Sequence, residues 1–246
     1  MSSQKAYFIS DAHLGSPDPE KSLQREIKLV QFLEQARQDA SVIYLMGDIF
    51  DFWYEYKSVV PRGFIRILGK ITELCDSGLE VHYFTGNHDL WVYDYLPEET
   101  GVILHREPLI TEIFGKTFYL AHGDGIDEKD RTFRFLKKIF TNSFLQWCFS
   151  RIHPNFAFAL ANKWSRYSHD QHGVPPFESE KEPFVLYARK YLMDQGIDYM
   201  VFGHRHCPVL YPLNDTTDLV MLGDWLSNFT IGIFDGKEFQ LKRANT

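Results

Sequence analysis

This 246-residue chain contains five short polar motifs, each at the end of an apolar run. Their side chains offer oxygen and nitrogen atoms that could together bind metal and form one reactive site. The stretch Thr85–Asp89 follows the apolar run Val81–Phe84 and presents Asn87 and His88 in consecutive positions. Taken alone, such a stretch makes an ordinary polar turn as readily as a functional site. Four further apolar runs end in side chains of the same kind: Asp11, His13, Asp48, His122, His204 and His206. Alone, each aspartate more often caps a helix or loop, but coincidence at five places is far less expected than at one.

The seven candidate ligands suit a pair of divalent metal ions. They combine carboxylate, amide and imidazole donors and include no thiolate, which disfavours a soft-metal site. We expect Mn²⁺ first, with Fe²⁺ and Zn²⁺ as alternatives. Two such ions about 3.5–4 Å apart, sharing one carboxylate, activate a bridging hydroxide and stabilise the charge that develops in an in-line displacement at phosphorus. The predicted reaction is therefore hydrolysis of a phosphoester or phosphoanhydride.

The elements that must position these ligands alternate between strand and helix. Apolar runs predict strands at Ala6–Ser10, Val42–Met46 and Val81–Thr85, and helical spacing predicts helices over about Glu20–Gln38 and Arg62–Cys75. This order indicates a βαβ sheet. Ligands of such sheets bind beyond the carboxyl ends of the strands, so the motifs that follow the strands can converge although they are far apart in sequence.

The second half of the chain predicts further strands and one more helix. Pro108–Phe114 and Thr117–Ala121 are expected to form a hairpin, and a helix is expected from Pro183 to about Gln195 before the strand Tyr199–Phe202. The tail is expected to form a β-meander of four strands: Val209–Leu213, Leu219–Leu222, Thr230–Phe234 and Glu238–Leu241. The three cysteines form no paired framework, which fits reduced thiols in a cytosolic protein.

Together the motifs resemble those of the calcineurin-like metallophosphoesterases. They match in order and spacing, as Asp11-x-His13, Gly47-Asp48-x-x-Asp51, Gly86-Asn87-His88-Asp89, His122-Gly-Asp and Gly203-His204-x-His206. The resemblance implies an α/β fold, a sandwich of two mixed β-sheets flanked by helices with a helical cap insertion. It implies one metal on Asp11, His13, Asp48 and His206, and the other on Asp48, Asn87, His122 and His204. It also implies that His88 approaches the phosphoryl group and that Asp51 orients its ring.

A cationic and aromatic segment follows the fourth motif. Residues 131–169 hold seven Lys and Arg and no Asp or Glu, although the whole chain carries a net charge of −7. We expect a core at 1–126 and 183–246 and a helical cap at 127–182. The segment could be a helical subdomain with a basic solvated face, or a cap for a ligand that is apolar at one end and anionic at the other, or for an anionic membrane surface. Nucleic acid is a weaker third choice for this segment, since aromatics interleaved with Lys and Arg can stack bases. For the whole chain no nucleic-acid partner is expected, given its acidic net charge. The candidate substrate-binding residues are Asn87, Arg131, Lys163, Ser165, Arg166 and His204.

Within that family, the chain resembles the UDP-2,3-diacylglucosamine diphosphatases of lipid A synthesis. Similar features are the Ala121–Asp124 strand end, the insertion after it, His204-Arg205-His206-Cys207-Pro208 and Leu222–Trp225. The resemblance implies cleavage of a UDP-linked diacyl sugar to UMP and 2,3-diacylglucosamine 1-phosphate, on the cytoplasmic face of the inner membrane as a peripheral protein. This chain departs from the pattern of that subgroup at one position: it has His88 where the best-known members have Arg. The alternatives are a soluble nucleotide phosphodiesterase or phosphatase, and a non-catalytic scaffold that binds a membrane or a partner.

Overall fold

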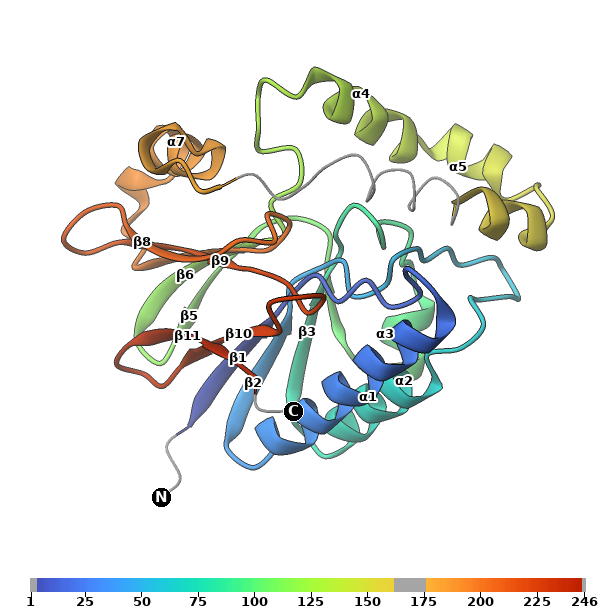
Figure 1. Cartoon of the computed structure of the whole chain (residues 1–246), viewed down its shortest axis with the longest axis horizontal. Coiled ribbons are helices and arrows are strands. Elements are labelled where there is room, and N and C mark those ends of the chain that lie inside the picture. Colours follow the sequence, from blue (N-terminus) through green and yellow to red (C-terminus); the bar gives the residue numbers. More distant parts are fainter. Residues whose placement is uncertain (1–3, 162–175, 245–246) are drawn as a thin grey trace.

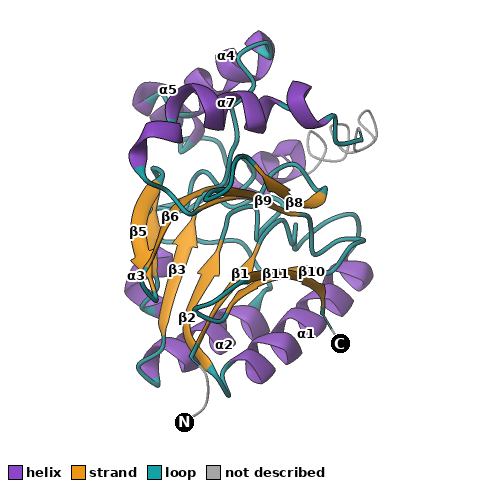
Figure 2. Ribbon diagram, turned by 90° about the vertical axis from the view of Figure 1, so that its left-hand side faces the viewer, coloured by secondary structure: helices purple, strands orange, loops and turns teal. Residues whose placement is uncertain are grey.

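Two β-sheets pack face to face, with helices on the outer side of each (Figures 1 and 2). The computed structural model describes residues 4–161 and 176–244. One sheet has the strand order β11-β10-β1-β2-β3-β4 and the other the order β5-β6-β7-β9-β8. The first contains β1 (Lys5–Ile9), β2 (Ala40–Leu45), β3 (Glu80–Phe84), β4 (Ile103–His105), β10 (Thr230–Phe234) and β11 (Phe239–Arg243). The second contains β5 (Leu109–Ile113), β6 (Lys116–Ala121), β7 (Tyr199–Phe202), β8 (Pro208–Pro212) and β9 (Asp218–Leu222).

Both sheets mix parallel and antiparallel pairs. Strands β1 to β4 are parallel, whereas β10 and β11 join that sheet antiparallel. In the other sheet β6, β7 and β9 are parallel, and β5 and β8 form antiparallel edges. The predicted sandwich of two mixed sheets with flanking helices is confirmed.

Helices cover both sheets and extend beyond their carboxyl ends. They are α1 (Pro19–Ala36), α2 (Ile65–Asp76), α3 (Tyr95–Thr100), α4 (Arg131–Phe140), α5 (Ser143–Phe149) and α7 (Pro183–Tyr191), with short 3₁₀ helices at Ser179–Lys181 and Met193–Gln195. Helices α1 and α2 cover the six-stranded sheet, and α7 covers the five-stranded one. Helices α4 and α5 lie apart from both sheets, across the top of Figure 1, and contain no fully buried residue.

Three apolar layers hold this arrangement together. The central layer lies between the sheets and includes Phe8, Phe118 and Phe234. A second layer joins the six-stranded sheet to α1 and α2, and a third joins the five-stranded sheet to α7. Because strands such as β1 and β7 are covered on both faces, they read in the sequence as continuous apolar runs rather than alternating ones.

The start of α2 differs from the prediction. The helix begins at Ile65 rather than Arg62, since Phe64 has a left-handed backbone with φ of 59° that a helix does not continue through. Phe64 offers no side-chain cap, and the carboxylate of Glu26 on α1 accepts the backbone N–H of Arg66 and Ile67 instead, at 3.1 Å each. Contact between two helices therefore sets where α2 starts.

The predicted C-terminal β-meander is wrong. Strands β8 and β9 form a hairpin in the five-stranded sheet, whereas β10 and β11 form one in the six-stranded sheet. The connection between β9 and β10 crosses from sheet to sheet. It is anchored by Trp225, which is fully buried and donates its backbone N–H to the Asp11 carbonyl at 3.0 Å. Local turn signals cannot distinguish such a crossing from a continuous meander. The short strand β4 is also absent from the prediction.

Candidate metal centre

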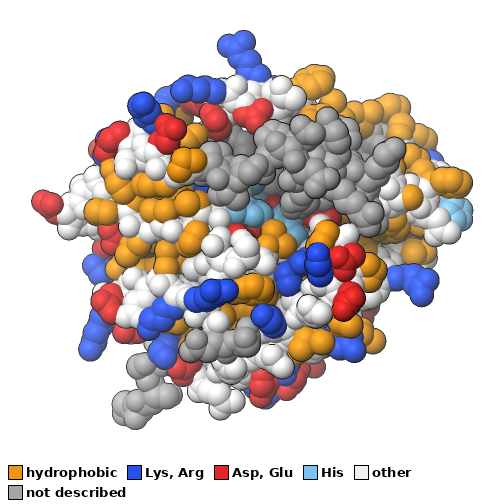
Figure 3. All heavy atoms as spheres, viewed as in Figure 1, with side chains coloured by type: hydrophobic (Ala, Val, Ile, Leu, Met, Phe, Trp, Pro, Cys, Tyr) orange, Lys and Arg blue, Asp and Glu red, His pale blue; other side chains and the backbone are white. Residues whose placement is uncertain are grey.

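The five motifs follow β1, β2, β3, β6 and β7, and the structure brings them to one place between the carboxyl ends of the two sheets. The sheets touch there, because Nδ1 of His122 lies 2.8 Å from the Met46 carbonyl and His204 donates its backbone N–H to Asp11 Oδ2 at 2.9 Å. Histidine side chains are visible at the centre of the face in Figure 3. The site is therefore built from both sheets.

Five of the seven predicted ligands have a left-handed backbone conformation. Their φ angles are 55° for Asp11, 42° for His13, 53° for Asp48, 63° for His204 and 53° for His206. This region is sparsely populated by residues other than glycine, and holding a residue there costs about 1–3 kcal/mol. Strain of this kind persists only where surrounding contacts enforce it, and its concentration in one cluster marks the cluster as functional.

Two motif glycines allow the chain segments to approach each other closely. A Cβ atom on Gly86 would collide with the carboxylate of Asp48, and one on Gly203 would collide with Ser10 Oγ and lie 2.9 Å from Asp11 Oδ2. A larger residue at either position would push a candidate ligand away. These glycines are thus needed for space around the carboxylates.

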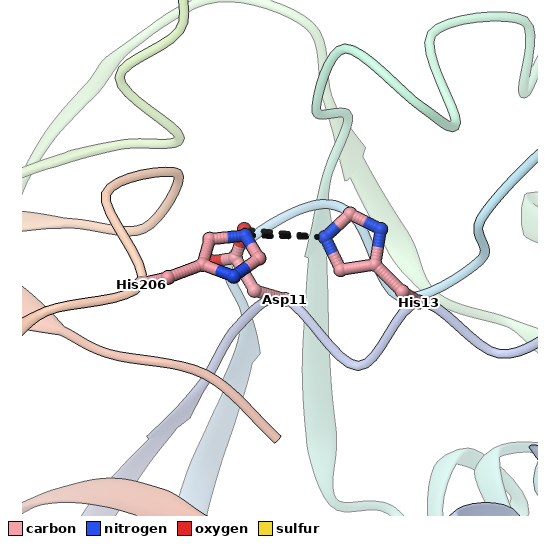
Figure 4. A group of neighbouring side chains, drawn as sticks. All are labelled: Asp11, His13 and His206. Atoms are coloured by element: carbon pink, nitrogen blue, oxygen red, sulfur yellow. Dashed lines mark hydrogen bonds and ion pairs between the residues drawn. The ribbon is translucent and has the colours of Figure 1, made fainter. Parts of the chain in front are cut away.

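The first cluster contains Asp11, His13 and His206 (Figure 4). Nε2 of His206 lies 3.1 Å from Asp11 Oδ1 and 3.3 Å from Nε2 of His13. Nε2 of His13 lies 3.7 Å from the same Asp11 oxygen. One carboxylate oxygen and two imidazole nitrogens thus converge on a common point, as ligands of one divalent ion do.

The second cluster contains Asp48, His122 and His204. Oδ2 of Asp48 lies 3.2 Å from Nε2 of His122 and 3.9 Å from Nε2 of His13 in the first cluster. Asp48 therefore lies between the two clusters, where a carboxylate shared by two ions would lie. Among the described residues, Oδ1 of Asn87, Oδ1 of Asp11 and Nε2 of His122 are buried without a hydrogen-bond partner. Buried polar atoms left in this state fit ligands of absent cations.

Charges inside the cluster shift several pKa values. Burial lowers the pKa of His204 to about 4, and the neighbouring His122 adds to the effect. Burial also acts to lower the pKa of His13, but Asp11 and Asp51 outweigh it and raise this pKa to about 10. Burial opposes ionisation of Asp11, yet His206 and His13 hold its pKa well below the usual range. These shifts favour an ionised Asp11 beside a protonated His13, so a cation that binds here would compete with a proton on that imidazole.

His88 and Asp51 lie beside the first cluster. Nδ1 of His88 lies 2.9 Å from the backbone carbonyl of Asp51 and 3.8 Å from its carboxylate. The carboxylate is nearer to Nδ1 of His13, at 3.3 Å. Burial lowers the pKa of His88, which favours a neutral ring. A neutral ring that donates from Nδ1 to the carbonyl has its lone pair on Nε2, so the backbone of Asp51 fixes the tautomer of His88.

Asp89 holds the loop that carries Asp48. Its carboxylate is fully buried, and burial together with the charge of Asp48 raises its pKa to about 6. It accepts hydrogen bonds from the backbone N–H groups of Gly86 (2.7 Å), Ile49 (2.9 Å), Asp48 (3.3 Å) and Phe50 (3.4 Å), and from the hydroxyl of Tyr83 (2.5 Å). The sequence signal for this role is its place at the end of the third motif.

Replacing Asp89 with asparagine is expected to lower the free energy of unfolding by about 2–4 kcal/mol. The asparagine NH₂ group would face N–H donors and leave them unsatisfied. Urea denaturation of the metal-free chain measures the effect, and Asp235→Asn, in an exposed turn, is the control, with an expected change within about 1 kcal/mol. An unchanged denaturation midpoint in Asp89→Asn would contradict this role.

Arg25 on α1 shapes the loop that follows β1, and nothing in its sequence context indicated this. The guanidinium is buried and donates to the carbonyls of Ala12 (3.2 Å), His13 (2.8 Å) and Ser16. The indole N–H of Trp225 donates to the Arg25 carbonyl at 3.3 Å. A helix residue and the crossing segment therefore together position His13.

The structure describes three of the six residues predicted to bind substrate. His204 lies in the second cluster, and Asn87 directly precedes His88, with its Oδ1 buried. Arg131 is the first residue of α4 and is exposed. Three of the predicted residues lie outside the described part of the chain: Lys163, Ser165 and Arg166.

The chain matches known proteins over almost its whole length. A family model described as calcineurin-like phosphoesterase matches residues 5–208. A protein of Porphyromonas gingivalis named UDP-2,3-diacylglucosamine hydrolase is 37% identical over 253 residues, which cover 97% of each chain. Proteins with the same name from Neisseria meningitidis serogroup B and Aeromonas salmonicida are 29% and 25% identical, over 91% and 96% of this chain and 91% and 92% of theirs. The resemblance inferred from the five motifs is thereby confirmed, and the chain belongs to the calcineurin-like phosphoesterase family.

Proposed function

We propose that this protein hydrolyses the pyrophosphate bond of UDP-2,3-diacylglucosamine and releases UMP and 2,3-diacylglucosamine 1-phosphate, a step of lipid A biosynthesis. The observation that carries the proposal is the 37% identity, over 97% of both chains, to a protein named for hydrolysis of this substrate. The chain retains all seven candidate metal ligands, and six of them gather in two clusters that Asp48 connects. A non-catalytic scaffold would have no need to keep them.

The residues of the centre would divide the work as follows. Asp11, His13, Asp48 and His206 would hold one ion, and Asn87, His122 and His204, with Asp48, the other. Two divalent ions, for which we propose Mn²⁺, supply charge stabilisation and a hydroxide nucleophile at neutral pH. His88 would lie against the phosphoryl group, with its ring held by the backbone of Asp51. Asp89 and Arg25 act through the loops and would keep the ligands in position.

An aromatic cluster between the core and residues 127–182, the proposed cap, suits the acyl chains. Trp91 lies 4.9 Å from Phe149 and 5.6 Å from Phe140, measured between ring centroids. Phe52 lies 5.5 Å from Phe158 in the same way. The indole N–H of Trp91 donates to the Phe140 carbonyl at 2.8 Å and so attaches the end of α4 to the core. Acyl chains would gain apolar contact area from these rings, and a soluble nucleotide carries no acyl chain to place there.

The outer face of the cap suits a membrane surface. Large side chains are exposed there, with 66% of Phe144, 53% of Trp147 and 74% of Phe156 accessible. The guanidinium of Arg151 lies 4.8 Å from the Trp147 ring centroid. In the described part of the chain, no helix is long and apolar enough to span a bilayer. We therefore propose peripheral association with the cytoplasmic face of the inner membrane, through apolar insertion and attraction to anionic lipids.

The assay that tests the function is hydrolysis of UDP-2,3-diacylglucosamine in detergent with Mn²⁺, with UMP followed by mass spectrometry. We expect a chelator to abolish UMP release and added Mn²⁺ to restore it, because the protein side chains cannot replace the metal ions in the reaction. A soluble diester, bis(p-nitrophenyl) phosphate, is run in parallel. Turnover of the soluble diester alone would retain the metal chemistry and contradict the lipid substrate.

A further inference from the structure

A cavity of about 670 Å³ lies beside the metal centre and is separate from the aromatic cluster of the cap. Its wall includes the candidate ligand His122 and side chains from α4, from α7 and from the connection between β4 and β5. Figure 2 shows both helices above β6, the strand that leads to His122. The volume lies within the range of about 300–1,000 Å³ that is usual for small-ligand sites.

Many of the side chains that line this cavity are polar, whereas those of the aromatic cluster are mostly apolar. Among the described residues, no phenylalanine or tryptophan of the proposed cap lines it. Four tyrosines do, and the hydroxyls of two of them, Tyr119 and Tyr187, lie 3.1 Å apart. The hydroxyl of a third, Tyr93, is buried and has no hydrogen-bond partner in the described structure. A buried hydroxyl in this state is a group that a ligand can satisfy.

Two arginines on the cavity wall make no ion pair in the described structure. The Arg106 guanidinium donates to the carbonyls of Val92 and Tyr93 at 2.8 and 2.9 Å, which fixes its orientation. Arg134 on α4 makes no ion pair among the described residues. The third cation, Lys137, is paired with Asp124 at 2.6 Å. Glu128 also lines the cavity, but its carboxylate is paired with Lys190 at 2.8 Å. Arginines that make no ion pair beside a candidate metal ligand suit a phosphate-bearing ligand.

We infer that this cavity binds the nucleotide half of the substrate, the UMP moiety that leaves on hydrolysis. The inference rests on the proposed function and adds a direction to it: the nucleotide lies on the His122 side, and the acyl chains lie on the side of the aromatic cluster. Three features of the cavity support a nucleotide over a lipid chain, namely the tyrosine hydroxyls, the unpaired arginines and the direct continuation to a metal ligand. An acyl chain in this cavity would leave these polar groups without hydrogen-bond partners.

The test uses the full chain loaded with Mn²⁺ and compares binding of UMP, ribose 5-phosphate and inorganic phosphate by calorimetry. All three ligands can place a phosphate on the metals, so the differences report the nucleoside. We expect UMP to bind at least about tenfold more tightly than phosphate. Tyr93→Phe should weaken UMP about threefold to tenfold and raise KM for the UDP-lipid by a similar factor, because one hydrogen bond is lost. Arg134→Gln should weaken UMP about tenfold or more.

The controls are Tyr211→Phe and Arg243→Gln, which lie on β8 and β11 and do not line the cavity. Both control variants should bind UMP as tightly as the parent and hydrolyse bis(p-nitrophenyl) phosphate at the parent rate, since neither residue lines the cavity. UMP binding no tighter than phosphate, or unchanged in both cavity variants, would overturn the inference even if the lipid substrate is cleaved. An altered dependence on acyl-chain length in Tyr93→Phe would also overturn it. Failure of the proposed function would appear separately, as no release of UMP from the lipid substrate by the parent protein.

Discussion

Replacing Asp48 with alanine is expected to reduce hydrolysis at least about 1,000-fold and to prevent the binding of a metal pair. Asp48 is the one candidate ligand whose carboxylate lies near histidines of both clusters, 3.2 Å from His122 and 3.9 Å from His13. Its other oxygen accepts the backbone N–H of His88 at 2.8 Å, so alanine would also release the third motif. Charge stabilisation by metal is worth several kcal/mol in such reactions, which corresponds to a loss of this order.

Turnover and metal content should be measured on the same preparations of Asp48→Ala. Asp215→Ala, in an exposed loop of the other sheet, is the control and should keep the parent rate and two bound ions per chain. Circular dichroism and a urea denaturation curve would separate a folding defect from loss of the site. A variant that keeps both ions and more than a tenth of the parent rate would contradict the shared position of Asp48.

Replacing Phe144 and Trp147 together with alanine is expected to reduce binding to anionic vesicles at least about tenfold. The two rings stack at 6.0 Å between centroids on an exposed part of α5, and both are more than half accessible. Each could therefore transfer apolar surface to a bilayer at about 25 cal/mol per Å². Hydrolysis of UDP-2,3-diacylglucosamine in vesicles should fall with binding, whereas hydrolysis of bis(p-nitrophenyl) phosphate should stay unchanged.

Vesicle sedimentation with phosphatidylglycerol-containing and purely zwitterionic lipids measures this effect. The control replaces Leu210 on β8, which is 44% exposed and lies on another element, with alanine. Equal losses on lipid and soluble substrates would contradict a membrane role for this face of α5. Equal binding to the anionic and the zwitterionic vesicles would show that affinity comes from insertion of the rings and would contradict an electrostatic contribution.

Predictions from the sequence succeeded where a short segment carries its own signal. The strands that precede the five motifs are covered on both faces, so each is a continuous apolar run that ends at a polar residue. The four C-terminal strands lie within two residues of their predicted positions, but their pairing as one meander was wrong. That pairing depends on Trp225, whose buried position and contact with the Asp11 carbonyl form only after distant segments pack. The start of α2 failed for the same reason, since the cap of its first turn comes from Glu26 on another helix.

The candidate ligands could be found in the sequence because metal chemistry restricts residue types and the motifs fix their spacing. The residues that hold these ligands in position could not be identified from the sequence. Arg25 reads as one cation among many on a helix, although its guanidinium is buried under the loop after β1. Asp89 stands in a recognised motif, but its five hydrogen bonds come from two segments that are far apart in sequence, residues 48–50 and 83–86. The cavity beside His122 is likewise a property of packed helices and has no sequence signature.

The pairing of β1 with β10 has a consequence for how the protein matures on the ribosome. The first strand has β2 on one side, but its other neighbour is made only when residues 230–234 emerge. His204 and His206 are also translated late, so a nascent chain shorter than this holds Asp11 and His13 without the imidazoles that complete either ion site. Loading with metal must therefore follow translation of most of the chain, and until then the early strands expose an unpaired edge of the kind that chaperones shield.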